Sequence, residues 1–262
     1  MGVRCDPGRG VLAHVSEEEG RPGLRARVSV FLTILAMTIV PTSTVRAVGV
    51  CGDVGWTNYF DGYYSTDQVR SSKATIRDRP IFLCNENAGA TSAATAWAMV
   101  AGAGGLQYAQ AGYIKFAGSA NPQAFTEYND GTSIWDASHW WRTTYAGIWS
   151  NGAQHSYVVD YNATTGKLYM QIDGLTKAST PWSPDLVWNT PWSAQFFGET
   201  MDRGDDVPGT PGARTDFSSV AVRHCAGCIW QAPTGNSLLS DWPYYKFAWT
   251  LNPTAFQIYT QR

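Results

Sequence analysis

The sequence has little charge and few histidines, and both shortages narrow the functions that it can have. Charged residues make up 15% of the 262 residues, and the lysines and arginines form no cluster. Binding to phosphate backbones needs a basic surface, so we expect no nucleic-acid partner. Serine or cysteine catalysis needs a partnered histidine. After residue 47 the only histidines are His139, His155 and His224, and none lies in a recognised nucleophile motif.

Long apolar runs are also scarce. The longest, from Val28 to Val40, is shorter than the roughly 20 residues that a membrane-spanning helix needs. Arg25 and Arg27 precede it, and Val45-Arg46-Ala47 follows as a small-residue cleavage site. This order is typical of a secretory signal peptide, which we predict over residues 1–47; an uncleaved N-terminal anchor is the alternative. The prediction implies a secreted, extracellular protein without stable membrane association after cleavage.

The chain that follows has the composition of one secreted β domain. Residues 48–262 contain all twelve tryptophans, and no internal repeat or linker divides them. Six of the 19 basic and four of the 21 acidic residues precede residue 48, so this part carries a net charge of −4. Amphipathic helices are absent, and glycines and prolines interrupt the chain at short intervals. This composition favours an all-β fold, and a single antiparallel β-sandwich is the simplest architecture.

Four cysteines follow the predicted cleavage site: Cys51, Cys84, Cys225 and Cys228. An even number in an exported chain indicates two disulfides, for which three pairings exist. We predict Cys51–Cys84, which would fix the N-terminal segment, and Cys225–Cys228. The alternative for the second pair is a zinc site that includes His224. Zinc needs a further matched pair of ligands, so we expect no metal.

Alternating apolar and polar residues predict strands between residue 90 and the C-terminus. The clearest hairpin surrounds residues 162–166, because this loop contains glycine and both flanks alternate. Prolines interrupt the tryptophan-rich stretch 181–192, so we expect a loop there. We assign residues 90–262 to the sandwich and residues 48–89 to an N-terminal segment tied by a disulfide. The predicted strands cover residues 95–100, 107–116, 124–128, 155–161, 167–172, 193–201 and 215–223.

Two of these strands carry polar residues in otherwise apolar, aromatic blocks. Gln110 lies in the block Tyr108–Tyr113, and Glu199 lies in the block Ala194–Glu199. Gln195 and Glu199 share one face of their strand, because side chains alternate between the two faces. A carboxylate and a carboxamide on one sheet can flank a water molecule and a carbonyl group, which is the minimum for metal-free amide hydrolysis. The alternative is that both are polar residues on a solvated face.

The order of these blocks resembles that of the glutamic peptidases, both the eqolisin and the neprosin family. A strand at residues 96–102, similar to the eqolisin A-W-V-G-I-D-G strand, precedes Gln110. The Gln-Ala-Gly block that begins at Gln110 is similar to Q-T-G of eqolisins and E-A-G-W of neprosins. Glu127-Tyr128 and the turn 162–166 are similar to the next two eqolisin blocks. The block Ala194–Glu199 resembles A-E-W-I-V-E of eqolisins and W-G-G-E of neprosins.

This resemblance implies a fold, an activity and a set of residues. The fold is a concanavalin-like sandwich of jelly-roll type, with the site on its concave face. The activity is endopeptidase cleavage of a polypeptide at acidic pH without a cofactor. Gln110 takes the position of the first member of the catalytic dyad, and Glu199 takes that of the second. Gln195 stands where eqolisins have the first glutamate of the last block, and neprosins have two glutamates as their dyad.

In the mechanism that the resemblance implies, Glu199 takes a proton from the attacking water and returns it to the leaving amine. Gln110 donates an amide N–H to the developing oxyanion. We expect Glu127 to orient Gln110 or the water, with Trp97 as an apolar wall and Gln195 as a further supporting residue. Apolar surroundings raise the pKa of a carboxyl group by desolvation, which favours work at acidic pH.

Two other functions fit the same composition. A carbohydrate-binding or adhesive sandwich would stack a glycan on exposed aromatic rings. Glycoside hydrolysis needs paired carboxylates, which Glu127 and Glu199 would supply. A peptidase should bring Gln110 and Glu199 together in a groove, whereas a lectin should show a planar strip of exposed aromatics. The candidates for that strip are Trp140-Trp141, Trp182, Trp188, Trp192 and Tyr244-Tyr245.

Overall fold

The computed structural model of the protein describes residues 58–87, 92–132, 136–202, 204–241 and 243–261. The predicted signal peptide, residues 1–47, and Cys51 lie outside these ranges, so the cleavage and the Cys51–Cys84 disulfide stay predictions. Across the described ranges, no helix is both long enough and apolar enough to span a membrane.

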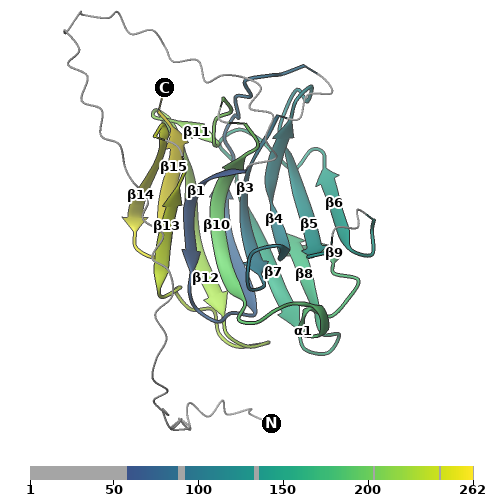
Figure 1. The fold of residues 1–262 in the computed structure, drawn as a ribbon. Helices are drawn as coiled ribbons and strands as arrows, with labels where there is room; N and C mark the ends of the chain where they lie inside the picture. Colours follow the sequence, from purple (N-terminus) through teal and green to yellow (C-terminus); the bar gives the residue numbers. More distant parts are fainter. Residues whose placement is uncertain (1–57, 88–91, 133–135, 203, 242, 262) are drawn as a thin grey trace, which may run out of the picture. The chain divides into compact units, whose positions relative to one another are not determined.

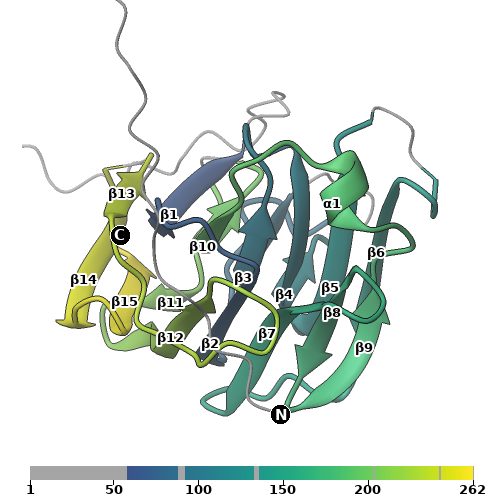
Figure 2. The ribbon, with the colours of Figure 1, turned by 90° about the horizontal axis from the view of Figure 1, so that it is seen from below.

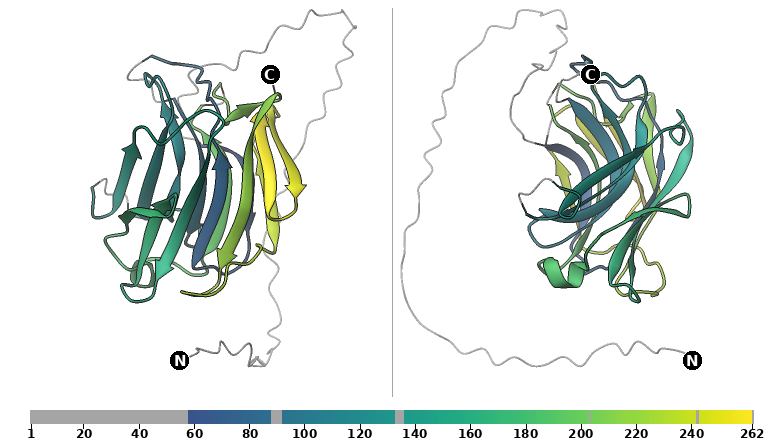
Figure 3. Two further views of the ribbon diagram at one scale, coloured as in Figure 1. Left: turned by 180° about the vertical axis from the view of Figure 1, so that it is seen from behind. Right: turned by 90° about the vertical axis from the view of Figure 1, so that its right-hand side faces the viewer.

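Two antiparallel sheets stacked face to face make up the fold (Figure 1), and the view from below shows them as two layers (Figure 2). The all-β sandwich expected from the sequence is thereby confirmed. The seven-stranded sheet has the order β13 (Asn236–Ser240), β1 (Tyr59–Ser65), β10 (Ser193–Thr200), β3 (Ala93–Ala101), β4 (Gln107–Phe116), β5 (Gln123–Asp130) and β6 (Trp140–Tyr145). The second sheet, foremost in the left view of Figure 3, has the order β14 (Tyr245–Leu251), β15 (Ala255–Thr260), β12 (Ala213–Arg223), β2 (Ser71–Arg77), β7 (Gln154–Asn162), β8 (Lys167–Ile172) and β9 (Leu175–Ser179), with β11 (Gly209–Thr210) paired to β12.

Side chains between the sheets form the main core, and their alternation along each strand follows the predicted pattern. In the hairpin of β7 and β8, Val159 lies opposite Met170, and both side chains are fully buried. The predicted loop joins the two arms, because β7 ends at Asn162 and β8 begins at Lys167. The inner face of the seven-stranded sheet is rich in small residues: Ala94, Ala96, Ala98, Ala109, Ala111, Ala124 and Ala194 are all fully buried there.

The sandwich begins earlier in the sequence than residue 90, where we expected it to begin. β1 pairs with β10 and β13, and β2 pairs with β7 and β12, so both strands lie inside their sheets. Their sequences hide this role, because polar residues occupy buried positions that usually carry apolar ones. Asp61, Ser65, Ser71 and Ser72 each have no exposed area. Part of the expected N-terminal segment is therefore central to both layers.

The tryptophan-rich stretch between β9 and β10 contains no strand, as expected, but it forms part of the core. A four-residue helix, α1 (Pro184–Val187), lies within it. The ring centroids of Trp182 and Trp188 are 5.6 Å apart, and those of Trp188 and Trp192 are 5.2 Å apart. Trp188 and Trp192 are buried, so this chain of rings closes one end of the sandwich.

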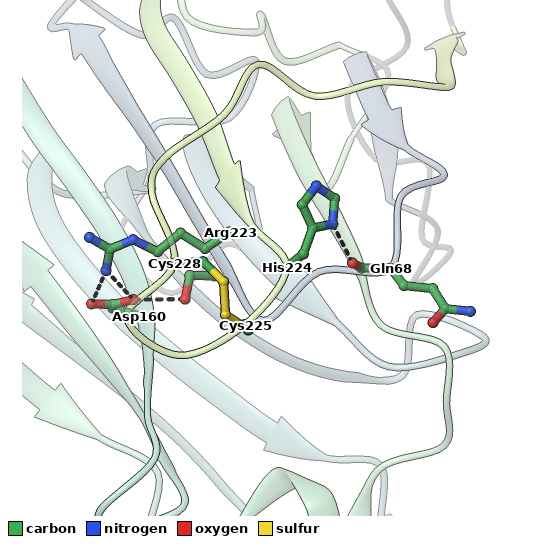
Figure 4. Close-up of a disulfide and its surroundings, with 7 residues drawn as sticks. Gln68, Asp160, Arg223, His224, Cys225 and Cys228 are labelled. Carbon is green, nitrogen blue, oxygen red and sulfur yellow. Dashed lines mark hydrogen bonds and ion pairs between the residues drawn. A yellow bond between two sulfur atoms is a disulfide. The ribbon is translucent and has the colours of Figure 1, made fainter. Parts of the chain in front are cut away.

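The predicted disulfide between Cys225 and Cys228 is confirmed, with a Cα–Cα distance of 5.3 Å (Figure 4). Beside it, the His224 Nδ1 atom lies 2.8 Å from the backbone oxygen of Gln68. Both sulfur atoms of this pair are thus committed to each other and do not act as zinc ligands. Cys84 is also disulfide-bonded, whereas its predicted partner Cys51 lies outside the described residues.

Candidate active site

The residues singled out in the sequence gather on the outer face of the seven-stranded sheet, which points away from the other sheet. Met99 in β3 lies opposite both Gln110 in β4 and Gln195 in β10, so these three side chains share a face. Glu127 lies opposite Gln110 on the next strand. Glu199 follows Gln195 by four positions and therefore points to the same side.

Trp97 also lies on this outer face, where it belongs to a second, smaller hydrophobic cluster. Its members, Trp97, Met99, Ala101, Ile114, Phe125 and Phe197, are all at most 6% exposed. Large side chains on this face thus bury one another. The result is an apolar surface, rather than a solvated one, around the polar residues.

Glu127 is saturated with hydrogen-bond donors. Its Oε1 accepts from the Tyr108 hydroxyl at 2.8 Å and from the Trp140 Nε1 at 2.8 Å. Its Oε2 accepts from the Gln110 Nε2 at 2.9 Å and from the Arg142 Nε at 2.8 Å. The side chain is only 1% exposed. Glu127 is therefore a fixed acceptor at the centre of a buried network, and it has no open position for exchanging a proton with a substrate.

The network of Glu127 determines how Gln110 presents its amide. The Nε2 group points to Glu127, so the Oε1 atom points elsewhere, and it has no hydrogen-bond partner among the described residues. The Gln110 side chain is buried, with 5% exposed. A buried carbonyl oxygen gains about 1–3 kcal/mol when it finds a donor. Gln110 therefore has an unused acceptor, which is itself buried, and one further N–H.

Glu199 has a different environment, because a single described donor holds it. Its Oε2 accepts from the Trp97 Nε1 at 2.7 Å, and its side chain remains partly exposed. Burial raises the pKa of Glu199 to about 7; the Trp97 hydrogen bond opposes this, the Glu127 charge adds to it, and the Arg142 charge opposes it. The carboxyl group therefore exchanges its proton near neutral pH, as an acid–base catalyst must.

A glycine makes room for the tryptophan that holds Glu199. Gly112 lies opposite Trp97 across the β3–β4 pair. A Cβ atom at Gly112 would lie 2.8 Å from the Trp97 Cβ and 2.0 Å from the Ala96 backbone oxygen, which is closer than real Cβ atoms approach. On its other side Trp97 packs against Phe197, with ring centroids 5.5 Å apart. Gly112 thus fixes the position from which Trp97 donates to Glu199.

Gln110 and Glu199 share a face but are not bonded to each other. Glu199 lies opposite Thr95 on β3, whereas Gln110 lies opposite Met99, so the two are offset by four positions, or about 13 Å along the strands. Gln110 binds Glu127, and Glu199 binds Trp97. On β10, the residue level with Gln110 is Gln195, and β3 lies between these two strands.

Three residues of the site were not predicted from the sequence as members of it: Tyr108, Trp140 and Arg142. Arg142 lies directly opposite Glu127 across the β5–β6 pair. No strand was predicted at residues 140–145. Only with such a strand beside β5 does the opposite-charge pair of Glu127 and Arg142 become visible in the sequence. Trp140 turns its indole N–H toward Glu127.

The aromatic strip expected for a glycan-binding protein does not form from its candidate residues. Trp188, Trp192 and Tyr245 are buried at 6%, 3% and 2% exposure. Trp141 and Tyr244 are the exposed members, and they lie on β6 and beside β14, strands of different sheets. Pairing of Glu127 with Glu199 for glycoside hydrolysis is also disfavoured, because donors occupy both oxygens of Glu127.

No protein-family model and no curated protein matches the sequence. Among solved structures, scytalido-glutamic peptidase with a transition-state analogue inhibitor aligns at 13% identity and a TM-score of 0.51, over 78% of this chain and 98% of that one. SCP-B, a member of the eqolisin family solved in complex with the tripeptide Ala-Ile-His, aligns at 12% identity and a TM-score of 0.50, with the same coverage. The chain thus has the fold of the glutamic peptidases.

Proposed function

We propose that this protein is a secreted glutamic-type peptidase that hydrolyses peptide bonds in polypeptides at acidic pH. The observation that carries the proposal is Glu199, a partly exposed carboxyl group with a pKa near 7 on an otherwise apolar face. Burial and a single donor from Trp97 give it the properties of a proton-transfer residue. The shared fold of the glutamic peptidases supports the same reaction class.

The raised pKa sets the order of proton transfers. At acidic pH Glu199 is protonated, so it first donates its proton to the oxygen of the scissile carbonyl while water adds to the carbon. The added water then returns one proton to the Glu199 carboxylate. In the second step Glu199 delivers this proton to the leaving nitrogen, the C–N bond breaks, and the hydroxyl proton of the intermediate restores Glu199. From the sequence we expected Glu199 to act first as a base, whereas its raised pKa favours the acid form as the starting state.

Gln110 binds the polypeptide in this proposal and does not act on the reacting bond, because it lies four positions along the strands and two strands away from Glu199. The N–H that Glu127 does not use donates to a main-chain carbonyl of the bound polypeptide. Glu127 keeps the amide in this orientation, so it is a positioning residue. Gln195 lies level with Gln110 on β10 and contributes a further neutral amide to the same row.

The test is digestion of a denatured protein between pH 3 and 8, with wild type compared with Glu199→Gln. The variant keeps an acceptor for Trp97 but has no proton to transfer, so we expect a loss of about 100-fold or more in activity. Unfolding monitored by tryptophan fluorescence should show that the variant remains folded. Wild-type activity should decline as the pH rises through about 7, because Glu199 then loses its proton.

A second variant, Gln195→Glu, decides between two positions for the acid. It places a carboxyl group level with Gln110, where eqolisins have a glutamate. Under our proposal wild type is active, and Gln195→Glu gains little because Glu199 already supplies the proton. An inactive wild type together with an active Gln195→Glu variant would overturn the assignment of Glu199.

A further inference from the structure

Next to the candidate active site, the outer face of the seven-stranded sheet contains a cavity of about 480 Å³. It lies over β13, β1 and β10, and the glycine-rich turn between β3 and β4 borders it. Its walls are mostly apolar and aromatic, and Gln195 and three hydroxyl residues, Ser65, Thr66 and Ser193, interrupt them. The side chains that define it are Phe60, Tyr64, Trp192, Phe197 and Leu239, together with Gln195.

Glycines keep this cavity open. Gly62 lies between Leu239 and Phe197 in the row of paired residues across β13, β1 and β10. A Cβ atom there would lie 2.7 Å from the Phe197 ring, so the ring leans over the glycine and forms the wall itself. At the border, Cβ atoms on Gly104 and Gly105 would meet nothing within 4 Å. The turn therefore does not obstruct the entrance to the cavity.

The cavity shares a wall with the proton-transfer residue of the proposed mechanism. Phe60 lies directly opposite Glu199 across the β1–β10 pair, and its ring contacts Phe197 at a centroid distance of 5.6 Å. Phe197 in turn packs on Trp97, which donates to Glu199. A group bound in the cavity would thus contact the aromatic side chains that pack around Glu199.

We propose that this cavity binds a bulky apolar side chain, above all an aromatic one, of a polypeptide substrate next to the cleaved bond. The proposal rests on the proposed function for its link to cleavage. The volume lies within the 300–1,000 Å³ typical of ligand sites. Aromatic rings pack edge-to-face or offset against one another, and Phe60, Phe197 and Trp192 supply such partners.

The lining also indicates which side chains are excluded. Among the described residues that line the cavity there is no Asp, Glu, Lys or Arg. A charged substrate side chain would lose its hydration there without gaining an ionic partner, which is costly. Gln195 and the turn backbone offer hydrogen bonds to the substrate main chain rather than a charge. We therefore expect discrimination in favour of Phe, Tyr or Leu, and against Asp or Lys.

Two neighbouring leucines on the edge strand β13 provide a matched test. Leu239 lines the cavity and is 37% exposed, whereas Leu238 points to the opposite side of the strand and is 56% exposed. Leu239→Trp should fill the cavity, and Leu238→Trp adds the same bulk elsewhere. Leu239→Ala, which enlarges the cavity, gives a second perturbation that the exposed edge tolerates.

Binding is measured first, with the Glu199→Gln protein so that the peptides stay intact. The probes are Ala/Gly peptides of equal length that carry a single Phe, Leu, Ala or Asp, with affinity followed by titration calorimetry. We expect the Phe peptide to bind at least tenfold more tightly than the Ala or Asp peptide. Leu239→Trp should remove this preference, Leu239→Ala should reduce it, and Leu238→Trp should leave it unchanged. Equal affinity for all four peptides would overturn the inference.

Cleavage is then measured with the wild-type active site, so that the two proposals fail separately. Leu239→Trp should raise KM for Phe-containing peptides with little change in kcat, since the proton-transfer residue is untouched. Selective binding without any cleavage would support the proposed binding role of the cavity and contradict the proposed peptidase activity. The opposite outcome is cleavage that does not depend on the side chain and is equal in the Leu238→Trp and Leu239→Trp variants. It would support the peptidase activity and contradict the binding role of the cavity.

Discussion

Two carboxyl groups lie on the same face of the same sheet, yet their surroundings differ. Glu127, in the half formed by β4, β5 and β6, receives four hydrogen bonds, one of them from a guanidinium group. Glu199, in the half formed by β1, β10 and β3, accepts one from Trp97 and lies beside the apolar side chains Phe60 and Phe197. The strand framework is the same on both sides.

Burial alone therefore does not decide whether a carboxyl group is suited to proton transfer. Both side chains have been removed from water to a large extent, but only Glu199 lacks enough compensating donors, and its pKa rises to about 7. The half around Glu127 therefore acts as a scaffold, and the half around Glu199 is suited to chemistry. Substitutions that exchange these roles, or leave them intact, test the distinction.

The largest effect on stability is expected from Glu127→Gln. The change leaves Arg142 with its charge largely buried and unpaired, and it places amide hydrogens against donors. We expect the free energy of unfolding to fall by about 3–5 kcal/mol, measured by urea denaturation. The matched control is Glu86→Gln, because Glu86 pairs with Lys115 with 45% of its side chain exposed. That pair should contribute at most about 1 kcal/mol, and equal losses in the two variants would contradict the scaffold role.

A smaller effect is expected from Gly112→Ala, which acts on the half around Glu199. The added methyl group displaces Trp97 or the Ala96 backbone, which should cost about 1–3 kcal/mol of unfolding free energy. Peptidase activity should fall as well, because the Trp97 hydrogen bond to Glu199 is disturbed. Gly212→Ala is the control, since a Cβ atom there meets nothing within 4 Å. Unchanged activity in Gly112→Ala would show that the Trp97 contact is dispensable.

The third expected effect is a dependence of the melting temperature on pH. Burial raises the pKa of Glu199 to about 7, and likewise that of Asp61 on the inner face to about 7. A carboxyl group with a raised folded-state pKa stabilises the fold fully below its unfolded pKa, near 4, and loses this contribution as pH rises through about 7. The melting temperature should therefore be several degrees higher at pH 4.5 than at pH 8.5.

The variants Glu199→Gln and Asp61→Asn should each flatten this pH dependence, because neither replacement titrates. Asp61 is the stronger contributor by burial, with no exposed area. A melting temperature that rises from pH 6 to 8.5 in wild type would contradict the raised values.

The alternation of apolar and polar residues along the chain was sufficient to predict the all-β sandwich, but it did not predict the contacts within the site. The alternation in residues 155–161 and 167–172 predicted the β7–β8 hairpin. The likeness to glutamic peptidases led us to expect Gln110 and Glu199 together on the concave face of a sheet, whereas the structure offsets them by four positions along the strands. β1 escaped prediction because Asp61 and Gly62 interrupt its apolar alternation. Its place between β10 and β13 depends on pairing with residues far away in the chain, which no local signal encodes.

The roles of individual side chains depend on which strands become neighbours. β10 lies beside β3, although almost a hundred residues separate them in the sequence, and this pairing brings Trp97 to Glu199. β6 lies beside β5, and this pairing brings Arg142 to Glu127. By residue type alone Glu127 and Glu199 are equivalent. Only the strand order shows that Glu127 accepts four hydrogen bonds and that Glu199 accepts one from Trp97.

The alanine-rich inner face has a consequence for how this molecule can change over time. The pleat separates it completely from the outer face, so each residue of β3, β4 and β10 serves either the stacking of the sheets or the chemistry, but not both. Replacements on one side leave the other nearly untouched. Such a chain can change the residues of its outer face while its architecture persists.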